Sequence, residues 1–144
     1  MNYDALKLSS QLCFPLYACS RKIIRLYTPV LEPLGLTYTQ YITMLALWEK
    51  SGETVKVLGE RLFLDSGTLT PLLKKLEEQG LIQRERSKND ERNVVVHLTE
   101  QGLLLKEKAL EVPKKVASCI HLSQKDAIEL HRILHLILSD GGQI

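Results

Sequence analysis

The chain has 144 residues, of which 44% are hydrophobic and 25% charged, so it is long enough for one globular domain and too apolar to be intrinsically disordered. Its 19 basic and 17 acidic side chains leave a net charge of only +2, so overall charge indicates neither a nucleic acid nor a membrane as partner. A polyanion-binding function must therefore be argued from where the charges lie.

Neither end of the chain resembles a targeting or membrane segment. Residues 1–10 lack a basic stretch followed by an apolar one, and the longest apolar run, residues 133–138, is interrupted by His135 and too short to span a bilayer. We therefore expect a cytoplasmic protein without membrane partners.

The sequence also lacks a recognisable metal or cofactor motif. The cysteines, Cys13, Cys19 and Cys119, form neither a CxxC pair nor a Cys/His zinc pattern. His131 and His135 are four residues apart and share a helix face, but no further ligand completes a metal site. We expect neither a metal nor a cofactor.

Helical periodicity dominates the first 80 residues. We expect a helix over about residues 10–34, with Pro15 in its first turn and therefore Cys13 at its start. A Thr37/Gln40 capping box opens a second helix, which ends at Ser51–Gly52. Two further helices, 54–64 and 68–79, flank a tight turn at residues 65–67. Trp48 and Phe63 are expected in the core.

The pattern then changes to short strands. Residues 81–86 and 93–98 flank a polar, turn-forming stretch, which predicts a β-hairpin with a charged tip. Thr99 caps a helix over about 100–112, which Pro113 kinks or restarts, and Ser123 caps a last helix that ends near Ser139. The fold class is α+β, mainly α.

A helix, a tight turn, a second helix and a charged hairpin, in this order, predict a winged helix-turn-helix that binds double-stranded DNA. The second helix enters a major groove, and the hairpin supplies cations to the flanking backbone and minor groove. The candidate DNA contacts are Ser66, Thr68, Thr70, Lys74, Lys75, Arg84, Arg86, Lys88 and Arg92. The same element order also occurs in protein-interaction modules, in which these charges are merely solvated surface.

Several motifs resemble MarR-family transcriptional regulators. They are the run Leu-Asp-Ser-Gly-Thr-Leu-Thr-Pro-Leu-Leu-Lys-Lys-Leu-Glu at residues 64–77, Gly-Leu-Ile at 80–82 and Asp-Glu-Arg at 90–92. The stretches at 11–14 and 36–41 are similar to the OhrR-type branch, which senses organic hydroperoxides and related oxidants.

This resemblance implies a homodimer that binds a palindromic operator. Residues 1–36 and 100–144 would form a helical dimerisation region and 37–99 the winged helix-turn-helix, within a single domain. The wide apolar stripe of the last helices is suited to burial against a partner. The resemblance also implies that Asp90 supports the wing through an ion pair with Arg92.

Cys13 is the candidate redox sensor. A helix start favours the thiolate, the form that attacks a peroxide, and Tyr17 is four residues on, on the same face. From these residues alone, an inert, packed cysteine is the favoured interpretation, because free cysteine is commonly buried and unreactive. The resemblance implies that Cys13 is the sensor and that Tyr17 and Tyr27 bond it, one of them from the partner subunit, with Tyr38 nearby. Pro15 departs from the family pattern beside this cysteine.

Two outcomes remain open for oxidised Cys13. The resemblance implies a disulfide either with a low-molecular-weight thiol or with a second cysteine of the other subunit, for which Cys119 is the candidate. Cys19 points away, because six residues turn a helix by roughly 240°.

The sequence thus predicts a repressor that releases its operator when an organic hydroperoxide oxidises Cys13, and not an enzyme. Three alternatives remain. The first is a MarR-type regulator that responds to a small phenolic ligand, with Cys13 incidental. The second is a thiol peroxidase, and the third a winged-helix protein-interaction module.

Overall fold

The computed structural model describes residues 2–140 and is mainly helical, with one small antiparallel sheet. The helices are α1 (Cys13–Leu31), α2 (Tyr38–Glu49), α3 (Val55–Leu62), α4 (Ser66–Glu78), α5 (Glu100–Ala109), α6 (Val112–Ser118) and α7 (Gln124–Ser139). The strands are β1 (Glu53–Thr54), β2 (Ile82–Arg86) and β3 (Val94–Leu98), and short 3-10 turns are η1 (Asp4–Leu6), η2 (Leu8–Ser10) and η3 (Glu32–Leu34).

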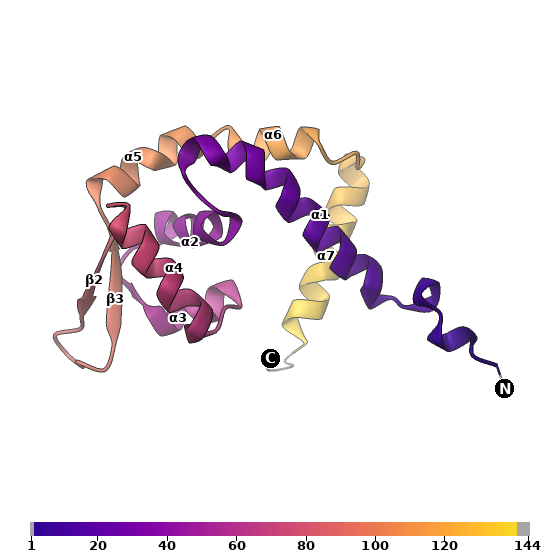
Figure 1. Ribbon diagram of the computed structural model, residues 1–144, viewed down its shortest axis with the longest axis horizontal. Coiled ribbons are helices and arrows are strands. Elements are labelled where there is room, and N and C mark those ends of the chain that lie inside the picture. The colour runs from indigo at the N-terminus through magenta and orange to yellow at the C-terminus, as the bar shows by residue number, and fades with distance from the viewer. Residues whose placement is uncertain (1, 141–144) are drawn as a thin grey trace.

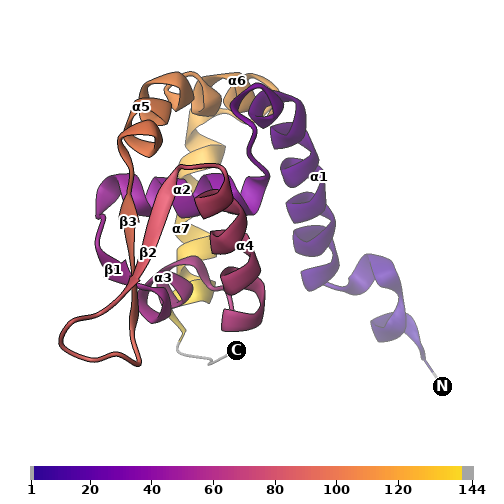
Figure 2. The same ribbon diagram turned by 60° about the vertical axis from the view of Figure 1, so that its left-hand side comes forward.

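The elements form a compact lobe with long helices beside it. Helices α2, α3 and α4 and the sheet make up the lobe, while α5 and α6 run in line across its top (Figure 1). Helix α1 descends from beneath α6 towards the N-terminus, and α7 descends from the far end of α6, as both views show (Figure 2). The predicted fold class is therefore confirmed.

The hydrophobic core lies in the lobe because α4 is strictly amphipathic. Its four buried leucines recur at spacings of three and four residues, which places them on one helix face. That face packs against a core that also contains Met44, Leu47 and Leu58, all almost fully buried. The four leucines are Leu69, Leu72, Leu73 and Leu76.

The helix caps predicted at Thr37, Thr99 and Ser123 are present, and Asp65 caps α4 as well. Thr37 and Gln40 form the reciprocal capping box of α2. The side chain of Asp65 accepts a hydrogen bond from the Thr68 N–H, that of Thr99 from Gly102, and that of Ser123 from Asp126. These caps satisfy backbone donors that a helix start leaves unpaired, and so they fix where α2, α4, α5 and α7 begin.

The elements differ from the expected ones in three places. The helix expected over about 100–112 ends at Ala109, but the restart expected at Pro113 is confirmed: α6 begins at Val112 with Pro113 in its first turn, where a missing N–H costs nothing. The first helix is shorter than predicted, because η3 and left-handed Gly35 replace its last turn. Strand β1 was not predicted, because two residues are too few to show a periodicity; it is a strand because it pairs with β3.

The sheet has the order β1-β3-β2, so β2 is an edge strand. The β2–β3 hairpin runs in the register Ile82↔Leu98 to Arg86↔Val94 and confirms the predicted hairpin. Residues 87–93 form its tip, and the hairpin extends below and to the left of the lobe in Figure 1.

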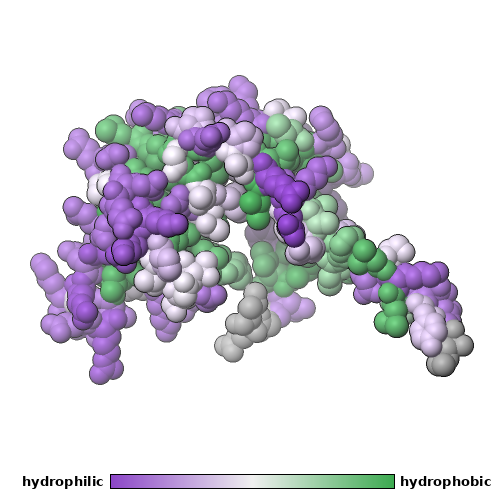
Figure 3. Space-filling model, viewed as in Figure 1, coloured by the Kyte–Doolittle hydropathy of each residue, from purple (hydrophilic) through white to green (hydrophobic). Residues whose placement is uncertain are grey.

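Helices α1 and α7 expose apolar side chains that this single chain does not cover. None of the described residues of α7 is buried. Figure 3 shows hydrophobic side chains along the free part of α1, whereas the hairpin side is hydrophilic. The exposed apolar residues of the two helices include Phe14, Leu16, Ile24, Ile128, Ile133, Leu136, Ile137 and Leu138. Within residues 2–140, no helix is long and apolar enough to cross a membrane.

Candidate DNA-binding surface and redox site

The turn between α3 and α4 is closed by a sharp reversal at Phe63. This residue has a positive φ of 53°, and the Leu64 N–H donates to the Gly59 carbonyl over 3.0 Å. A Cβ on Gly59 would lie 2.8 Å from the Leu64 carbonyl oxygen, so the close approach requires glycine. Phe63 was expected in the core, but it is 59% exposed, because the left-handed turn directs it outwards.

Helix α4 presents a polar face opposite its buried leucines. Its candidate DNA contacts Ser66, Thr68, Thr70, Lys74 and Lys75 are all exposed. The hydroxyl groups lie in the first turns, where the helix dipole favours a phosphate, and the lysines follow further along. This face has the arrangement that insertion into a major groove requires.

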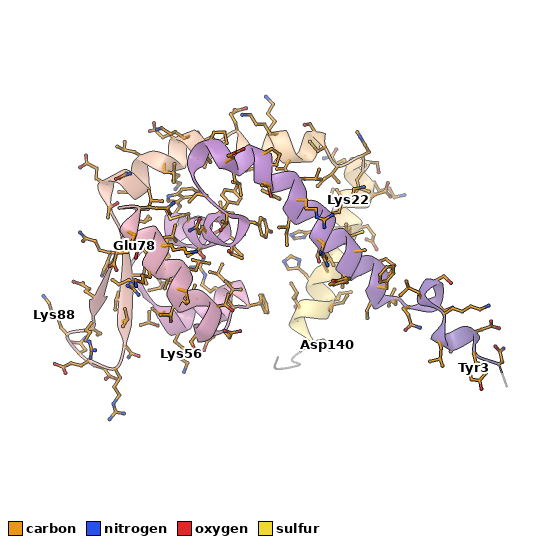
Figure 4. The ribbon with its side chains drawn as sticks, in the orientation of Figure 1. Tyr3, Lys22, Lys56, Glu78, Lys88 and Asp140 are labelled. Carbon is orange, nitrogen blue, oxygen red and sulfur yellow. The ribbon has the colours of Figure 1, made fainter. Side chains whose placement is uncertain are left out.

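The hairpin forms a wing with cations at and near its tip. Arg86, Lys88 and Arg92 are exposed, and Lys88 projects outwards from the wing (Figure 4). The tip is folded by a hydrogen bond of 2.8 Å from the Ser87 N–H to the Asn93 carbonyl. These three cations are therefore free to approach a nucleic-acid backbone beside α4.

Asp90 supports the wing differently from our expectation. Its carboxylate accepts a hydrogen bond of 3.1 Å from the backbone N–H of Arg92 and a longer one from the Asn93 amide. No ion pair with the Arg92 guanidinium is present among the described residues. The carboxylate closes a local turn instead, a common role of aspartate, and leaves the Arg92 side chain exposed.

Arg84, also expected to contact DNA, is turned inwards. Its Nε and Nη2 atoms lie 3.0 and 2.8 Å from Glu77 Oε2, and its backbone N–H donates to Glu77 Oε1 over 2.8 Å. These hydrogen bonds lower the pKa of the Glu77 carboxyl group below its usual value. Arg84 therefore connects the wing to α4.

Cys13 is the first residue of α1, as predicted, and is exposed. Pro15 occupies the first turn of the helix and does not interrupt it. One turn on, the Tyr17 hydroxyl accepts a hydrogen bond of 2.7 Å from Arg21, whose guanidinium also lies over the Tyr17 ring. Cys13, Tyr17 and Arg21 thus follow one another along one face of α1.

The other two candidate tyrosines, Tyr27 near the C-terminal end of α1 and Tyr38 at the start of α2, lie far from Cys13. The ring centroids of Tyr27 and Tyr38 are 4.8 Å apart, and Tyr41 lies 5.8 Å from Tyr27. Burial, reinforced by Tyr38, raises the pKa of the Tyr27 hydroxyl above 10.0, so it remains a proton donor at neutral pH. Fourteen residues of helix separate Tyr27 from Cys13 by roughly 21 Å, so the two do not meet within one chain.

All three cysteines, which lie within residues 2–140, are free and exposed. Cys119 caps the C-terminal end of α6, with its Sγ 3.5 Å from the Lys115 carbonyl oxygen. A cleft of about 820 Å³ separates the helix-turn-helix from the end of α7. Its apolar lining includes Phe63, Leu69, Ile137 and Leu138.

Sequence reasoning missed three residues that the structure adds to these sites: Arg21, Tyr41 and Glu77. The spacing could have found Tyr41, three residues after Tyr38 on one helix face, and Arg21, four residues after Tyr17. Glu77 gave no such signal, because its contact with Arg84 spans the turn between a helix and a strand.

Comparisons with known proteins support this picture. A family profile described as transcriptional regulator SarA/Rot matches residues 25–109. The organic hydroperoxide resistance transcriptional regulator of Bacillus subtilis (strain 168) is 50% identical over 136 residues, which cover 94% of this chain and 92% of that protein. This chain belongs to the MarR family of transcriptional regulators, in its OhrR/SarZ branch.

Two further relatives extend the comparison. The HTH-type transcriptional regulator SarZ of Staphylococcus aureus (strain USA300) is 46% identical, over 85% of this chain and 83% of that protein. Reduced AbfR bound to DNA, a Staphylococcus epidermidis protein, is 35% identical, with a TM-score of 0.75 over 93% of this chain and 96% of that one. The MarR-family chain described here is therefore a DNA-binding transcriptional regulator with a winged-helix fold.

Proposed function

We propose that the protein is a homodimeric repressor that binds a palindromic operator while Cys13 is reduced and releases it when an organic hydroperoxide oxidises Cys13. The observation that carries this proposal is the position of Cys13: an exposed thiol at the start of α1, beside the uncovered apolar side chains of that helix. Oxidation there would change an interface between subunits, and with it the placement of two DNA-binding lobes.

Dimerisation is supported by the apolar surfaces of α1 and α7. Phe14 and Ile24 on α1, and Ile133 and Ile137 on α7, are 40–57% exposed, an unfavourable arrangement in water for two entire helices. Pairing of these helices with a second copy would bury them. A two-fold axis would then present two α4 helices to successive major grooves, about 34 Å apart.

The dimer also explains the separation between the candidate tyrosines and the thiol. Because Tyr27 lies about 21 Å along α1 from Cys13 of its own chain, with Tyr38 packed beside it, only a second subunit placed antiparallel along α1 would bring the two tyrosines to the thiol. Tyr17 is the tyrosine that the same chain supplies. The neutral Tyr27 hydroxyl would donate a hydrogen bond to a thiolate and stabilise it.

The chemical step is a two-electron oxidation of one cysteine. The Cys13 thiolate attacks the terminal oxygen of the hydroperoxide, the O–O bond breaks, and the alkoxide leaves and takes up a proton as the alcohol. The sulfenic acid then condenses with a second thiol, which releases water and forms a disulfide. Reduction of that disulfide by a cellular dithiol restores the regulator.

We propose Cys119 of the other subunit or a low-molecular-weight thiol as the second thiol. Cys119 is exposed at the end of α6, a helix that packs against α1. Non-reducing electrophoresis and mass spectrometry of the oxidised protein distinguish the two. A covalent dimer that is lost in Cys119→Ser supports the first, whereas a monomer with one adduct per chain, seen only with added small thiol, supports the second.

The test of the redox switch is operator binding by Cys13→Ser and by the matched control Cys19→Ser. Both cysteines are exposed on α1, so the variants remove the same atom from the same helix. The operator DNA is first selected from a random library with the reduced protein. We expect cumene hydroperoxide to release this DNA from wild type and from Cys19→Ser, but not from Cys13→Ser. Release from Cys13→Ser would refute the proposal.

The cleft between the helix-turn-helix and α7 favours a second candidate function, response to a small phenolic ligand. About 820 Å³ of largely apolar space would accommodate an aromatic ring, and Lys56 at its rim offers a cation to a carboxylate. If this alternative holds, salicylate releases operator DNA equally from wild type and Cys13→Ser. If the redox proposal holds, salicylate does not change operator binding by wild type or by Cys13→Ser.

We further propose that the protein acts in the cytoplasm and without catalytic turnover. Its relatives are named as transcriptional regulators, and one oxidation per subunit suffices for a switch. A thiol peroxidase would instead consume many equivalents of hydroperoxide per subunit in the presence of a dithiol. Without a dithiol this protein should consume about one equivalent of hydroperoxide per subunit, and with a dithiol its further consumption should be slow, because each new equivalent must wait for the regulator's disulfide to be reduced.

A further inference from the structure

We propose that Glu77 and Arg84 form a clamp that sets the position of the wing relative to the recognition helix α4, and that they are positioning residues for operator binding. Glu77 is in the last turn of α4, and Arg84 lies in the middle of β2. The inference rests on DNA binding by α4 and the wing, and it removes Arg84 from the phosphate contacts.

Three hydrogen bonds make up the clamp. One carboxylate oxygen accepts the backbone N–H of Arg84, and the other accepts both Nε and Nη2 of its guanidinium, all within 3.0 Å. The two side chains are only 25% and 35% exposed. Charge-assisted hydrogen bonds in such an arrangement restrict two elements in direction as well as distance.

The clamp lies where it controls the outer edge of the sheet. Strand β2 is an edge strand, and Glu77 accepts the N–H of Arg84 on the side away from β3. The strand ends two residues later, at Arg86, roughly 7 Å away, where the tip with Lys88 begins. A change at Arg84 is therefore transmitted directly to the cations of the wing.

The polypeptide turn at Gly80 fixes only where β2 starts. Gly80 has a positive φ of 74°, and the Leu81 N–H bonds to the Leu76 carbonyl over 3.0 Å. Beyond that point β2 is held to β3 by the strand pairing and to the core by the buried Ile82 side chain. Glu77 adds the contact between α4 and the middle of the strand, so its carboxylate helps to set the angle between helix and wing.

Charge arguments and the clamp predict opposite results for Glu77→Ala. Removal of an acidic group near DNA strengthens binding if only the charge matters, because phosphates repel carboxylates. Loss of the clamp instead misplaces the wing and weakens operator binding, by roughly three- to tenfold. Glu78→Ala is the matched control: it is the adjacent residue on α4, exposed, and changes the charge equally (Figure 4).

Salt dependence separates positioning from phosphate contact at Arg84. If Arg84 neutralised a phosphate in each subunit, Arg84→Met would reduce the slope of log affinity against log salt by about 1.8 per dimer. The clamp predicts an unchanged slope, a loss similar to that of Glu77→Ala, and no further loss in the double variant. It also predicts weaker hydroxyl-radical protection at the operator ends, with central protection retained.

The experiment measures affinity for the selected operator and for unrelated DNA at 25 °C, with thermal unfolding of each variant recorded in parallel. A lower ratio of specific to non-specific affinity in Glu77→Ala, but not in Glu78→Ala, supports the clamp. Stronger or unchanged operator binding by Glu77→Ala refutes it, as does a reduced salt slope in Arg84→Met. Lys88→Ala tests separately whether this face of the protein binds DNA. An unchanged operator affinity would mean that α4 and the wing do not form the DNA-binding surface, independently of the clamp.

Discussion

The substitution Gly102→Ala tests the junction at which the helices α5 and α6 meet the DNA-binding lobe. Gly102 lies in the first turn of α5, and its carbonyl oxygen accepts a hydrogen bond of 2.9 Å from the Trp48 indole of α2. A Cβ at this position would lie 2.1 Å from the Leu81 carbonyl oxygen, well under the 3.0 Å that real contacts respect. About 1 Å of backbone movement is therefore needed.

That movement has a defined cost. The Leu81 carbonyl accepts a hydrogen bond from the Thr99 N–H, so its displacement loosens both the α5 cap residue and the start of β2. Overpacking costs about 1–3 kcal/mol, and a weakened hydrogen bond adds up to about 1 kcal/mol. The higher helix propensity of alanine offsets about 1 kcal/mol of this loss of stability. We expect a net loss of roughly 2 kcal/mol, or about 5–10 °C in the midpoint of thermal unfolding.

The assay is thermal unfolding followed by circular dichroism at one fixed protein concentration, because dimers unfold in a concentration-dependent way. Two other glycines provide a graded comparison. At Gly59 the added Cβ lies 2.8 Å from a backbone oxygen, so Gly59→Ala should lose less stability than Gly102→Ala. At Gly67 it lies 3.1 Å from a side-chain oxygen that can move, so Gly67→Ala should lose no stability. If Gly102→Ala is as stable as wild type or more so, the junction is not tightly packed and the reasoning is wrong.

Three further results are expected. Arg84 lowers the pKa of the Glu77 carboxyl group, so the ionised carboxylate stabilises the fold above pH 4.5. The difference in unfolding temperature between wild type and Glu77→Gln should therefore shrink as the pH falls below that value, and a constant difference would contradict this expectation. Burial and Tyr38 raise the pKa of the Tyr27 hydroxyl, so the stability that its neutral form provides is lost as the pH rises from 10.0 through the raised value. Burial also raises the pKa of Tyr41, so Tyr27→Phe should reduce but not abolish the tyrosinate absorbance that appears above pH 10, and an unchanged absorbance would contradict this assignment. Arg61→Met should lower the free energy of unfolding in urea by about 3 kcal/mol, because it leaves the buried Glu53 carboxylate without its main ion-pair partner. A loss under about 1 kcal/mol would mean that the second partner, Lys50, is enough to stabilise the carboxylate.

The local elements were largely predictable because their signals are local. The Thr37/Gln40 capping box, the leucine periodicity of α4 and the polar turn between two β-branched stretches each involve residues within a few positions of one another. Helix starts and the hairpin followed from these patterns, and so did the position of Cys13 at the start of α1.

What failed depended on turns, whose geometry neither helical nor strand periodicity encodes. Phe63 is hydrophobic, and only the left-handed turn after α3 shows that it points outwards. Arg84 is a cation that we expected to contact DNA, but it lies on the same face of β2 as buried Ile82 and pairs with Glu77 across the turn.

The sequence by itself determined the order of the elements, the polar face of α4 and the near-neutral charge balance, because these are properties of neighbouring residues. The tertiary structure decided which charges are available to DNA. Arg86, Lys88 and Arg92 remain exposed, while Arg84 is neutralised by an acid of α4. It also decided that Tyr27 is half-buried against Tyr38 and Tyr41 of α2, whereas Cys13 is exposed, so that the sensing site we propose is completed only by a second chain. Both outcomes are set by the packing of α4 against the sheet and of α1 against α2, which one-dimensional patterns do not encode.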